Sequence, residues 1–420
     1  MSDNKWKIGV DVGGTFTDFS CVSIDGERLT FKLPSTTNDP SEGVIAGIKE
    51  IINQTNISPA EISVFAHGTT VATNAVLERK GATLGLLTTE GFRDVLEIGR
   101  QMRTQMYSVR LKPETPIFLA PGAKRLGVVE RIGPDGSIVK PLDEDSLKKA
   151  VEELLIQGVE AVAIAFLFSF INPEHELRAR EIISKKWPSL TISISSEVDP
   201  VFREYERTVV TAFDAYIKPT VDTYLSNLSE ALEKEGISAP LQVMQSRGGL
   251  AGGKTARARP VRLFLSGPAG GVIGGLEEGK ESGFENLITV DIGGTSCDIA
   301  LINNSKPLLR QEGVIDSFSV RIPMVDVNAI GSGGGSVAWI DSAGGLRVGP
   351  HSAGSDPGPA CYNRGGNKPT VTDASLVMGL LDPNYFANGR LRLDGQKAYL
   401  ALEHDIAKPM QLTVDKAASG

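Results

Sequence analysis

A short motif that can hold phosphate occurs twice in the chain. Asp11 to Thr15 reads Asp-Val-Gly-Gly-Thr and Asp291 to Thr295 reads Asp-Ile-Gly-Gly-Thr, each directly after an apolar run. Glycines without Cβ let backbone N–H groups approach an anionic phosphate, and the threonine hydroxyl adds a donor. A carboxylate at a strand end can hold Mg²⁺, which prefers oxygen ligands. One copy alone equally fits a plain hairpin connector, but two copies favour a pair of turns that hold opposite ends of a triphosphate.

The repeat defines the candidate site residues. We predict that Asp11 and Asp291 hold magnesium and, with His67, are the catalytic residues. Asp18 and Asp298 end the two copies, and either could instead steady its own turn by accepting backbone N–H bonds. The predicted phosphate-binding residues are Gly13, Gly14, Thr15, Thr17, Gly293, Gly294, Thr295 and Ser296.

His67 is a separate candidate. We expect it at a strand-to-helix junction, because an apolar run precedes it and Gly68, Thr69 and Thr70 open a helical pattern. Free amides at a helix start can receive an anion, and an imidazole can carry a proton near neutral pH. A histidine that only caps the helix fits the same pattern.

Strand and helix signals alternate along the chain, which predicts an α/β protein. Strands are expected at 7–12, 17–24, 161–170, 190–195 and 241–245, and helices at 41–54, 172–186 and 203–235. The long helix from 203 starts a second part, so we predict two domains, 1–200 and 201–420.

Two glycine-rich segments resemble other nucleotide motifs. Gly331 to Ser336 lacks the third glycine of a dinucleotide fingerprint, so we expect a loop packed near the second turn, with Gly333 and Gly334 touching nucleotide. Gly248 to Thr255 satisfies the P-loop expression, but Pro260 ends any helix that follows it. We therefore reject a P-loop and expect Lys254 to be dispensable.

Composition excludes several classes of protein. The 420 residues carry a net charge of -8, which argues against a nucleic-acid partner. Three widely separated cysteines and four scattered histidines offer neither a disulfide framework nor a metal-ligand spacing. No apolar run reaches the roughly 18 residues needed to cross a bilayer. These features predict a cytoplasmic protein without membrane contact.

The two turns and several other segments resemble the hydantoinase/oxoprolinase A-subunit family, which also includes a subunit of the acetone carboxylases. The similar segments are Gly9 to Asp18, His67 to Leu77, Arg203 to Thr208, Met244 to Gly249, Ser266 to Gly271, Asp291 to Asp298, Ile330 to Trp339 and Val348 to Tyr362. A small-residue helix before the second turn also matches the order of the actin-like (sugar kinase/heat-shock ATPase) fold. The resemblance implies two lobes built on duplicated ribonuclease-H-like domains that bind ATP and Mg²⁺.

The resemblance also implies an activity. We expect ATP-dependent hydrolysis of a cyclic amide (hydantoin, 5-oxoproline or a related lactam or imide) by phosphoryl activation of its carbonyl. The chain would be the ATP-binding subunit of a two-component, oligomeric enzyme whose partner is a hydantoinase B-type subunit. Two alternatives remain: a subunit of an ATP-dependent acetone or acetophenone carboxylase, and a non-catalytic actin-like or chaperone-like ATPase. The segments at His67 to Leu77 and Ser352 to Tyr362 argue against the last.

The end of the sequence carries one further expectation. No Gly-Gly-x-Gly-Pro element follows Cys361, and residues 415–420 give no signal for a closing helix. We therefore expect the second lobe to be incomplete; a naturally short protein that contacts adenosine through Gly331 to Ser336 is the alternative. Asp326, Asp356 and Asp373 lie near this loop without an assignable role.

Overall fold

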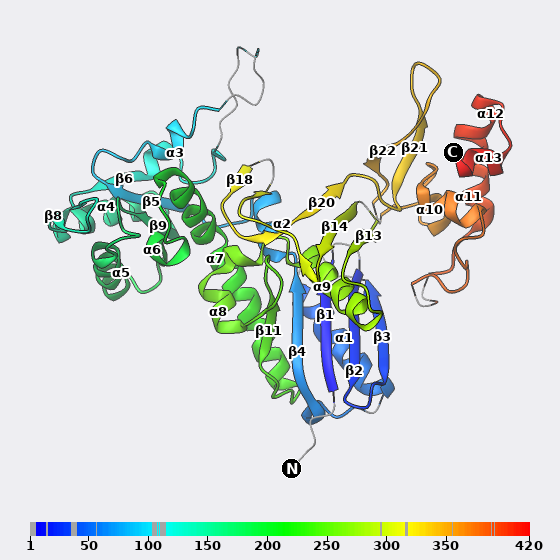
Figure 1. Ribbon diagram of the computed structural model, residues 1–420, viewed down its shortest axis with the longest axis horizontal. Coiled ribbons are helices and arrows are strands. Elements are labelled where there is room, and N and C mark those ends of the chain that lie inside the picture. The colour runs from blue at the N-terminus through cyan, green and yellow to red at the C-terminus, as the bar shows by residue number, and fades with distance from the viewer. Residues whose placement is uncertain are drawn as a thin grey trace. The chain divides into compact units, whose positions relative to one another are not determined.

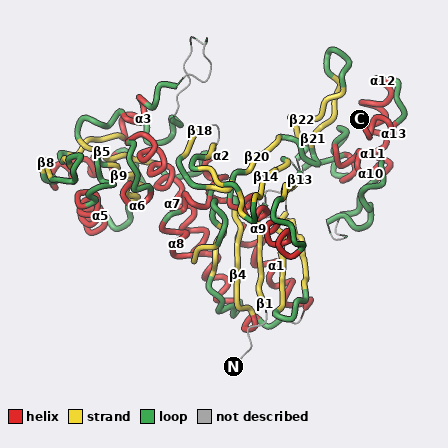
Figure 2. Tube along the Cα trace, viewed as in Figure 1, coloured by secondary structure: helices red, strands yellow, loops and turns green. Residues whose placement is uncertain are grey.

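The protein is a mixed α/β structure, which confirms the predicted class (Figures 1 and 2). Its structure is a computed structural model that describes residues 6–13, 16–34, 40–55, 57–102, 107, 109, 115–294, 296–315, 318–354, 356–387, 389 and 391–420. Contacts group the chain into a first unit (Met1–Lys7, Ile57–Gly267, Leu309–Met324) and a second unit (Ile8–Asn56, Pro268–Leu308, Val325–Gly420). These boundaries differ from the single boundary near residue 200, which stays a prediction.

The first unit contains a parallel sheet in the order β10-β9-β5-β6. Its strands are β5 (Leu84–Thr89), β6 (Arg125–Val128), β9 (Ala161–Ala165) and β10 (Thr191–Ile194). Every residue of β5 and β9 is buried, as expected for parallel strands that are covered on both faces. Helices α4 (Glu144–Ile156) and α5 (Glu174–Lys186) pack into the core of this sheet.

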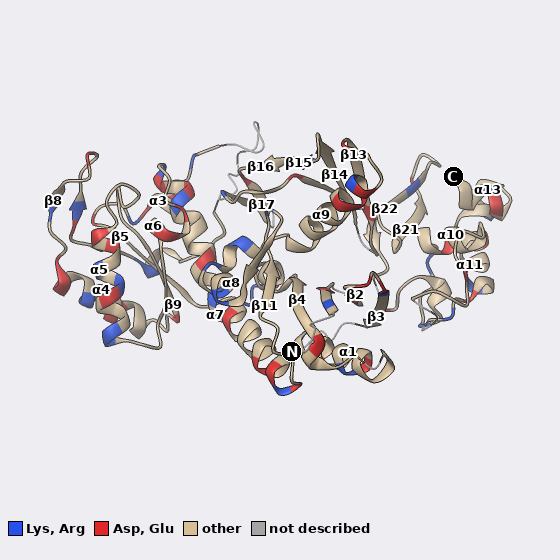
Figure 3. Ribbon diagram, turned by 60° about the horizontal axis from the view of Figure 1, so that its bottom comes forward, with Lys and Arg blue, Asp and Glu red and all other residues tan. Residues whose placement is uncertain are grey.

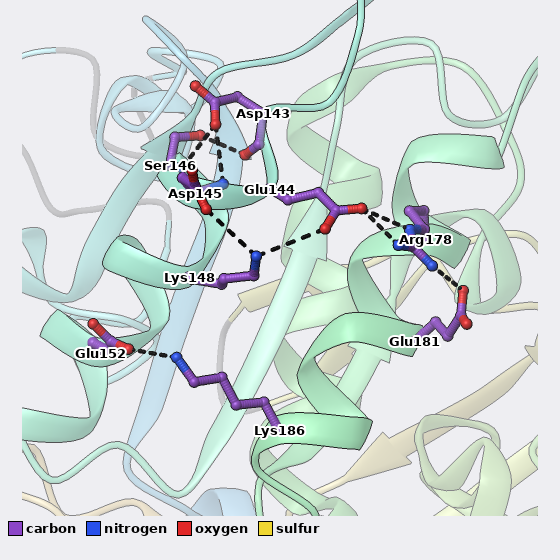
Figure 4. A network of polar contacts seen from close by, with 9 residues as sticks. All are labelled: Asp143, Glu144, Asp145, Ser146, Lys148, Glu152, Arg178, Glu181 and Lys186. Carbon is purple, nitrogen blue, oxygen red and sulfur yellow. Dashed lines mark hydrogen bonds and ion pairs between the residues drawn. The ribbon is translucent and has the colours of Figure 1, made fainter.

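Ion pairs join the outer surfaces of α4 and α5 (Figure 4). Arg178 pairs with Glu144 at 2.6 Å and with Glu181 at 2.8 Å, and Lys186 pairs with Glu152 at 2.7 Å. Charges of both signs are interspersed on these helices (Figure 3). Exposed ion pairs of this kind each contribute about 0.2–1 kcal/mol to the free energy of unfolding. We therefore interpret this face as a solvated surface.

A long helix and three more strands complete the main elements of the first unit. Helix α7 (Glu204–Lys234) packs against β9 and β10, and β11 (Leu241–Met244) runs parallel to β4 (Ile62–Thr69). Strand β12 (Leu250–Gly252) turns back antiparallel to β11. The other elements are η1 (Pro59–Glu61), α2 (Val71–Leu77), α3 (Val95–Ile98), η2 (Gly122–Lys124), β7 (Arg131–Ile132), β8 (Ile138–Lys140), α6 (Ser195–Val198), α8 (Gly253–Ala258), η3 (Pro260–Leu263), β16 (Leu309–Arg310), β17 (Gly313–Ile315), β18 (Phe318–Val320) and β19 (Met324–Val325).

The hairpin of β11 and β12 confirms the rejection of the P-loop. Strand β12 runs through the middle of the Gly248 to Thr255 expression, where a P-loop needs an open turn. Helix α8 has only six residues and ends before Pro260.

The second unit contains the two glycine turns. Strands β1 (Trp6–Val12), β2 (Phe16–Ser23) and β3 (Arg28–Pro34) flank the first turn, and helix α1 (Pro40–Thr55) packs against β2 and β3. Strand β1 begins in the first unit and ends in the second.

The second turn joins β13 (Leu287–Ile292) to β14 (Cys297–Asn303). Strand β14 also pairs with β20 (Val327–Ile330) and β15 (Lys306–Pro307). Helix α9 (Ser266–Glu281) lies along this sheet (Figure 1) and packs its apolar residues against Ala300 and Ile302.

Glycines let α9 approach β13 closely. A Cβ added at Gly275 would lie 2.5 Å from Cγ2 of Thr289, and one at Gly279 would lie 2.1 Å from Cδ1 of Leu287. The small residues noted in the sequence therefore lie on the face of α9 that contacts β13.

The C-terminal part of the second unit is a hairpin followed by helices. Its elements are β21 (Ser336–Ile340), β22 (Leu346–Ser352), η4 (Ala360–Tyr362), α10 (Val371–Val377), α11 (Gly395–Leu402), η5 (Glu403–Ala407), α12 (Lys408–Met410) and α13 (Val414–Ser419). The expectation of no helix at 415–420 is wrong. The hydroxyl of Thr413 caps α13 by accepting from the Lys416 N–H, and Val414, Ala417 and Ala418 are buried.

No helix among the described residues is both long enough and apolar enough to cross a membrane.

Candidate functional site

The first glycine turn follows β1. Asp11 is the penultimate residue of β1, and Gly13 follows the strand. Thr17 is only 1% exposed within β2, so its side chain is not accessible to a ligand in this structure. Three predicted phosphate-binding residues, Gly14, Thr15 and Thr295, lie outside the described residues.

The second turn places two carboxylates side by side. Asp291 on β13 and Asp298 on β14 are direct cross-strand partners. The N–H of Gly293 donates to the carbonyl of Ser296 at 2.9 Å and closes the turn between them. On α9, a Cβ added at Gly271 would lie 3.8 Å from Oδ2 of Asp291, so the helix backbone passes close to this carboxylate.

Electrostatics couples the carboxylates of the two turns, which all belong to the second unit. Partial loss of solvent raises the pKa of Asp11, and the charges of Asp18 and Asp291 raise this pKa further. Partial burial and the charge of Asp291 likewise raise the pKa of Asp298. Such an excess of negative charge suits a bound cation, which would favour the ionised carboxylates.

A magnesium ion here would have few protein ligands. No group of three or more His, Cys, Asp or Glu residues suited to a metal occurs among the described residues. This arrangement still fits Mg²⁺, which commonly keeps several waters and binds one or two carboxylates together with substrate phosphates. Asp11 and Asp291 are the residues that would hold it.

The two copies differ in one respect that the motif does not reveal. Lys32, opposite Asp18 in the β2–β3 register, places its Nζ 2.7 and 2.9 Å from the two carboxylate oxygens of Asp18. The residue opposite Asp298 on β20 is Ala329. The first turn therefore carries a cation beside its second aspartate, and the same position in the second turn carries a methyl group.

The loop from Gly331 to Ser336 packs on the second turn, as expected. The N–H groups of Gly334 and Gly335 donate to the carbonyls of Gly293 and Gly294 at 2.9 and 2.7 Å. The N–H of Gly333 donates to Oγ of Ser336 at 2.8 Å. Because Gly333 and Gly334 already use their N–H groups within the protein, we expect them to act by shaping the turn.

Asp373, whose role the sequence left open, is a fully buried anchor. Its carboxylate accepts from the N–H groups of Ala360, Cys361 and Thr370 and from the Thr370 hydroxyl, at 2.8 to 3.2 Å. The Thr-x-x-Asp spacing is a capping-box signal that could have predicted this contact. Asp373 thus fixes the end of the segment Val348 to Tyr362.

His67 lies beside the expected strand-to-helix junction, two residues inside the strand. It is within β4, which ends at Thr69, and α2 begins only at Val71. The imidazole is 1% exposed, and its Nε2 lies 2.8 Å from the hydroxyl of Tyr224 on α7. A general acid or base must come within hydrogen-bond reach of its substrate, so this burial gives the predicted catalytic role no direct support.

The charged segment Arg203 to Thr208 is more than a solvated helix face. Arg207 is 1% exposed, and its guanidinium donates to the carbonyl of Phe166 at 2.8 Å. Glu206 accepts from Arg100 at 2.5 and 2.9 Å. The helical charge pattern did not reveal that the start of α7 holds neighbouring segments of the first unit.

Comparisons with known proteins agree with these motifs. A family model described as hydantoinase/oxoprolinase matches residues 207–420, and one for the hydantoinase/oxoprolinase N-terminal region matches residues 7–187. The chain belongs to the hydantoinase/oxoprolinase family. The resemblance read from the sequence is thereby confirmed.

Relatives in this family include hydrolases and carboxylases. Caprolactamase subunit alpha of Pseudomonas jessenii is 39% identical over 100% of this chain and 61% of its own length. The acetophenone carboxylase gamma subunit of Aromatoleum aromaticum is 36% identical over 98% of this chain and 58% of its own length. The 5-oxoprolinase 1 of Arabidopsis thaliana is 32% identical over 91% of this chain and 32% of its own length.

Solved structures give the same result. The ATP-dependent caprolactamase of Pseudomonas jessenii matches with a TM-score of 0.84 and 38% identity, over 99% of this chain and 60% of that one. Nucleotide-free acetone carboxylase matches with a TM-score of 0.79 and 30% identity, over 99% of this chain and 61% of that one. The chain thus spans about three fifths of the length of the caprolactamase and carboxylase relatives and about one third of 5-oxoprolinase 1. The caprolactamase and acetophenone carboxylase relatives are named as subunits.

Proposed function

We propose that this chain is the ATP-binding subunit of an ATP-dependent enzyme that hydrolyses a cyclic amide, such as a lactam, a hydantoin or 5-oxoproline. The observation that carries the proposal is the coupled set of carboxylates at the two glycine turns. Asp11, Asp18, Asp291 and Asp298 belong to one unit. Beyond the effect of burial, the charges of Asp18 and Asp291 raise the pKa of Asp11, and the charge of Asp291 raises the pKa of Asp298. The names of the caprolactamase and 5-oxoprolinase relatives support the substrate class.

The chemistry requires ATP because a cyclic amide resists water. Its carbonyl is resonance-stabilised and its nitrogen is a poor leaving group. Transfer of the γ-phosphoryl group of ATP to the amide oxygen gives an activated imidate, which water then attacks. Bound magnesium would neutralise charge on the phosphoryl group, as in other phosphoryl transfers.

The chain would position the metal and the phosphate groups and would donate hydrogen bonds to the phosphate oxygens. Asp11 and Asp291 would hold the metal, and N–H groups of the two turns, at 13–15 and 294–295, would donate to phosphate oxygens. The N–H of Gly293, predicted as a phosphate donor, instead closes the second turn on the carbonyl of Ser296. The contacts of Gly334 and Gly335 with the second turn would keep it in shape before the substrate arrives.

We further propose an actin-like fold of two lobes, with a boundary near residue 200. That position lies between the two regions matched by the family models, 7–187 and 207–420. The subunit names of the relatives support a B-type partner subunit that carries out the hydrolytic half of the reaction, within an oligomer.

A ketone carboxylase subunit is the second candidate. The acetophenone carboxylase relative and the acetone carboxylase structure favour it nearly as strongly as the caprolactamase relative favours hydrolysis. In that case the same phosphoryl transfer would activate a ketone or bicarbonate.

One assay separates the two. ATP turnover is measured for the chain with a B-type partner in the presence of caprolactam, hydantoin, 5-oxoproline, or acetone plus bicarbonate. We expect a cyclic amide to stimulate turnover and to be opened. Stimulation by acetone plus bicarbonate alone supports the carboxylase, and no ATP turnover with any substrate contradicts both.

A further inference from the structure

Lys32 gives the first glycine turn a positive charge that the second turn lacks. Its Nζ donates to Oδ1 and Oδ2 of Asp18 at 2.7 and 2.9 Å. Lys32 and Asp18 are cross-strand partners on β3 and β2, so the register of these strands sets the contact. Their side chains are 33% and 52% exposed, and ion pairs with that much exposure add little to stability. The contact therefore calls for an explanation other than the stability of the fold.

The second turn repeats this arrangement of strands without the cation. Asp298 on β14 is the cross-strand partner of Asp291 on β13 and, on its other side, of Ala329 on β20. Like charges directly opposite each other in a sheet repel. Since the position opposite Asp298 carries a methyl group instead of an ammonium group, a bound cation would have to offset this repulsion.

The charge of Lys32 also reaches Asp11, the metal ligand proposed for the first turn. Strand β1, which carries Asp11, is the neighbour of β2 in the sheet, and β2 is the neighbour of β3. The charges of Asp18 and Asp291 raise the pKa of Asp11, whereas the charge of Lys32 lowers it. Lys32 thus acts on Asp11 in the same direction as a bound metal ion, which also favours the ionised carboxylate.

The geometry of Lys32 favours a fixed charge over a side chain that binds phosphate. A lysine ammonium group has three donor hydrogens, and Nζ of Lys32 lies within hydrogen-bond distance of both oxygens of one carboxylate. A phosphate group would have to draw Nζ away from Asp18. Asp18 and Asp11 would then repel each other without a neighbouring cation.

We propose that Lys32 takes the place of a second metal ion at the two turns, so that the site holds a single divalent cation. Enzymes that transfer phosphoryl groups often use two metal ions. Here the ammonium group neutralises Asp18, and one Mg²⁺ would serve Asp11 and Asp291. Lys32 is a positioning residue, because it acts through Asp18 and not on the substrate. The inference rests on the proposed function, since it assumes that the turns hold a metal.

The number of bound metal ions tests the inference without catalysis. Mn²⁺, which takes the same oxygen ligands as Mg²⁺, is added to residues 1–420, and the free ion is measured by electron paramagnetic resonance. We expect the wild type to bind one Mn²⁺. Lys32→Met should bind a second ion with an affinity within about tenfold of the first, because Asp18 and Asp11 then lack a cation. Lys32→Arg keeps the charge and should bind one.

Two controls separate this effect from a general change in charge. Arg28→Met removes one positive charge from the same strand, where Arg28 pairs with Glu278 at 3.4 Å, and this variant should still bind one Mn²⁺. Asp18→Asn in the Lys32→Met background removes a carboxylate that the second ion needs, so this double variant should also bind one. If Lys32→Met does not fold, Lys32→Gln replaces it with the same expected result.

The reverse change applies the same test to the second turn. Ala329→Lys adds an ammonium group opposite Asp298, as Lys32 stands opposite Asp18. This variant should bind Mn²⁺ at least about tenfold more weakly than the wild type, because the added charge repels the metal. Asn328→Lys adds the same charge to the adjacent residue of β20, whose side chain points to the opposite face of the sheet, and should leave the affinity unchanged. Both positions are exposed.

Three results would overturn the proposal. The first is a single Mn²⁺ in Lys32→Met; if this variant also binds inorganic tripolyphosphate at least about tenfold more weakly than the wild type, Lys32 is a phosphate ligand instead. The second is a second Mn²⁺ in Arg28→Met as well. The third is equal Mn²⁺ affinity in Ala329→Lys and Asn328→Lys. A wild type that binds no Mn²⁺ would contradict the metal site of the proposed function itself, so the two failures can be told apart.

Discussion

Replacement of Gly275 by alanine tests how α9 and β13 fit together. The added Cβ would lie 2.5 Å from Cγ2 and 3.6 Å from Cβ of Thr289, so the side chain or the helix must shift. Overpacking of this kind costs about 1–3 kcal/mol. Alanine in place of glycine within a helix returns about 0.5–1 kcal/mol. We therefore expect Gly275→Ala to lower the free energy of unfolding by up to about 2.5 kcal/mol.

The neighbouring glycine provides the control. A Cβ at Gly274 meets no atom within 4 Å, so Gly274→Ala should keep the helical gain and stabilise the protein by about 0.5–1 kcal/mol. Urea unfolding, followed by a spectroscopic probe in the second unit, measures the free energy of unfolding of both variants. The comparison requires that both variants show the same m-value, the slope of this free energy against urea concentration. The difference between the two variants isolates the collision with Thr289.

A second substitution identifies the colliding atom. Thr289→Ser removes Cγ2. In the Thr289→Ser background, Gly275→Ala should therefore lower the free energy of unfolding by much less than it does in the wild-type protein. The reasoning fails if Gly275→Ala is as stable as Gly274→Ala, or if the serine background restores nothing.

Three further predictions concern charge. Asp11→Ala and Asp291→Ala should each lower magnesium-dependent ATP turnover at least about a hundredfold without unfolding, and wild-type turnover in both would contradict the two-turn site. Lys254→Ala should turn over ATP like the wild type, whereas an inactive but folded variant would revive the P-loop. Burial raises the pKa of Asp298 above 3.8, so its ionisation destabilises the fold as pH rises through that raised pKa. Asp298→Asn should thus be more stable than the wild type at pH 7 and no more stable below pH 3.8, and equal stability at both pH values would contradict this sign.

Local signals in the sequence predicted the elements that flank the turns. The apolar runs at 7–12 and 241–245 became β1 and β11, and the helical spacing at 41–54 became α1, because these signals lie within single segments. The helix α13 was missed because Val414, Ala417 and Ala418 are too few to give a clear period, and tertiary packing stabilises them.

Contacts set by register or by tertiary packing could not be read from the sequence. The motif identified Asp18, but only the β2–β3 register brings Lys32 to it. Arg207 fits a charged helix face by spacing, yet the fold buries it against the carbonyl of Phe166. His67 precedes a helical pattern, but β4 extends two residues beyond it and points the imidazole at Tyr224.

The glycines of α9 and the side chains of β13 that face them recur at nearly equal distances along the helix and the strand. Gly271, Gly275 and Gly279 recur every fourth residue, a step of about 6 Å along a helix, and they face Asp291, Thr289 and Leu287, which recur every second residue, a step of about 6.7 Å along a strand. A small slide of the helix along the strand would press a side chain against the residues between the glycines, whereas a slide of one full step would restore the fit. The helix can therefore settle only at discrete positions along β13, and the distance from the helix backbone to the Asp291 carboxylate is set in steps instead of varying continuously.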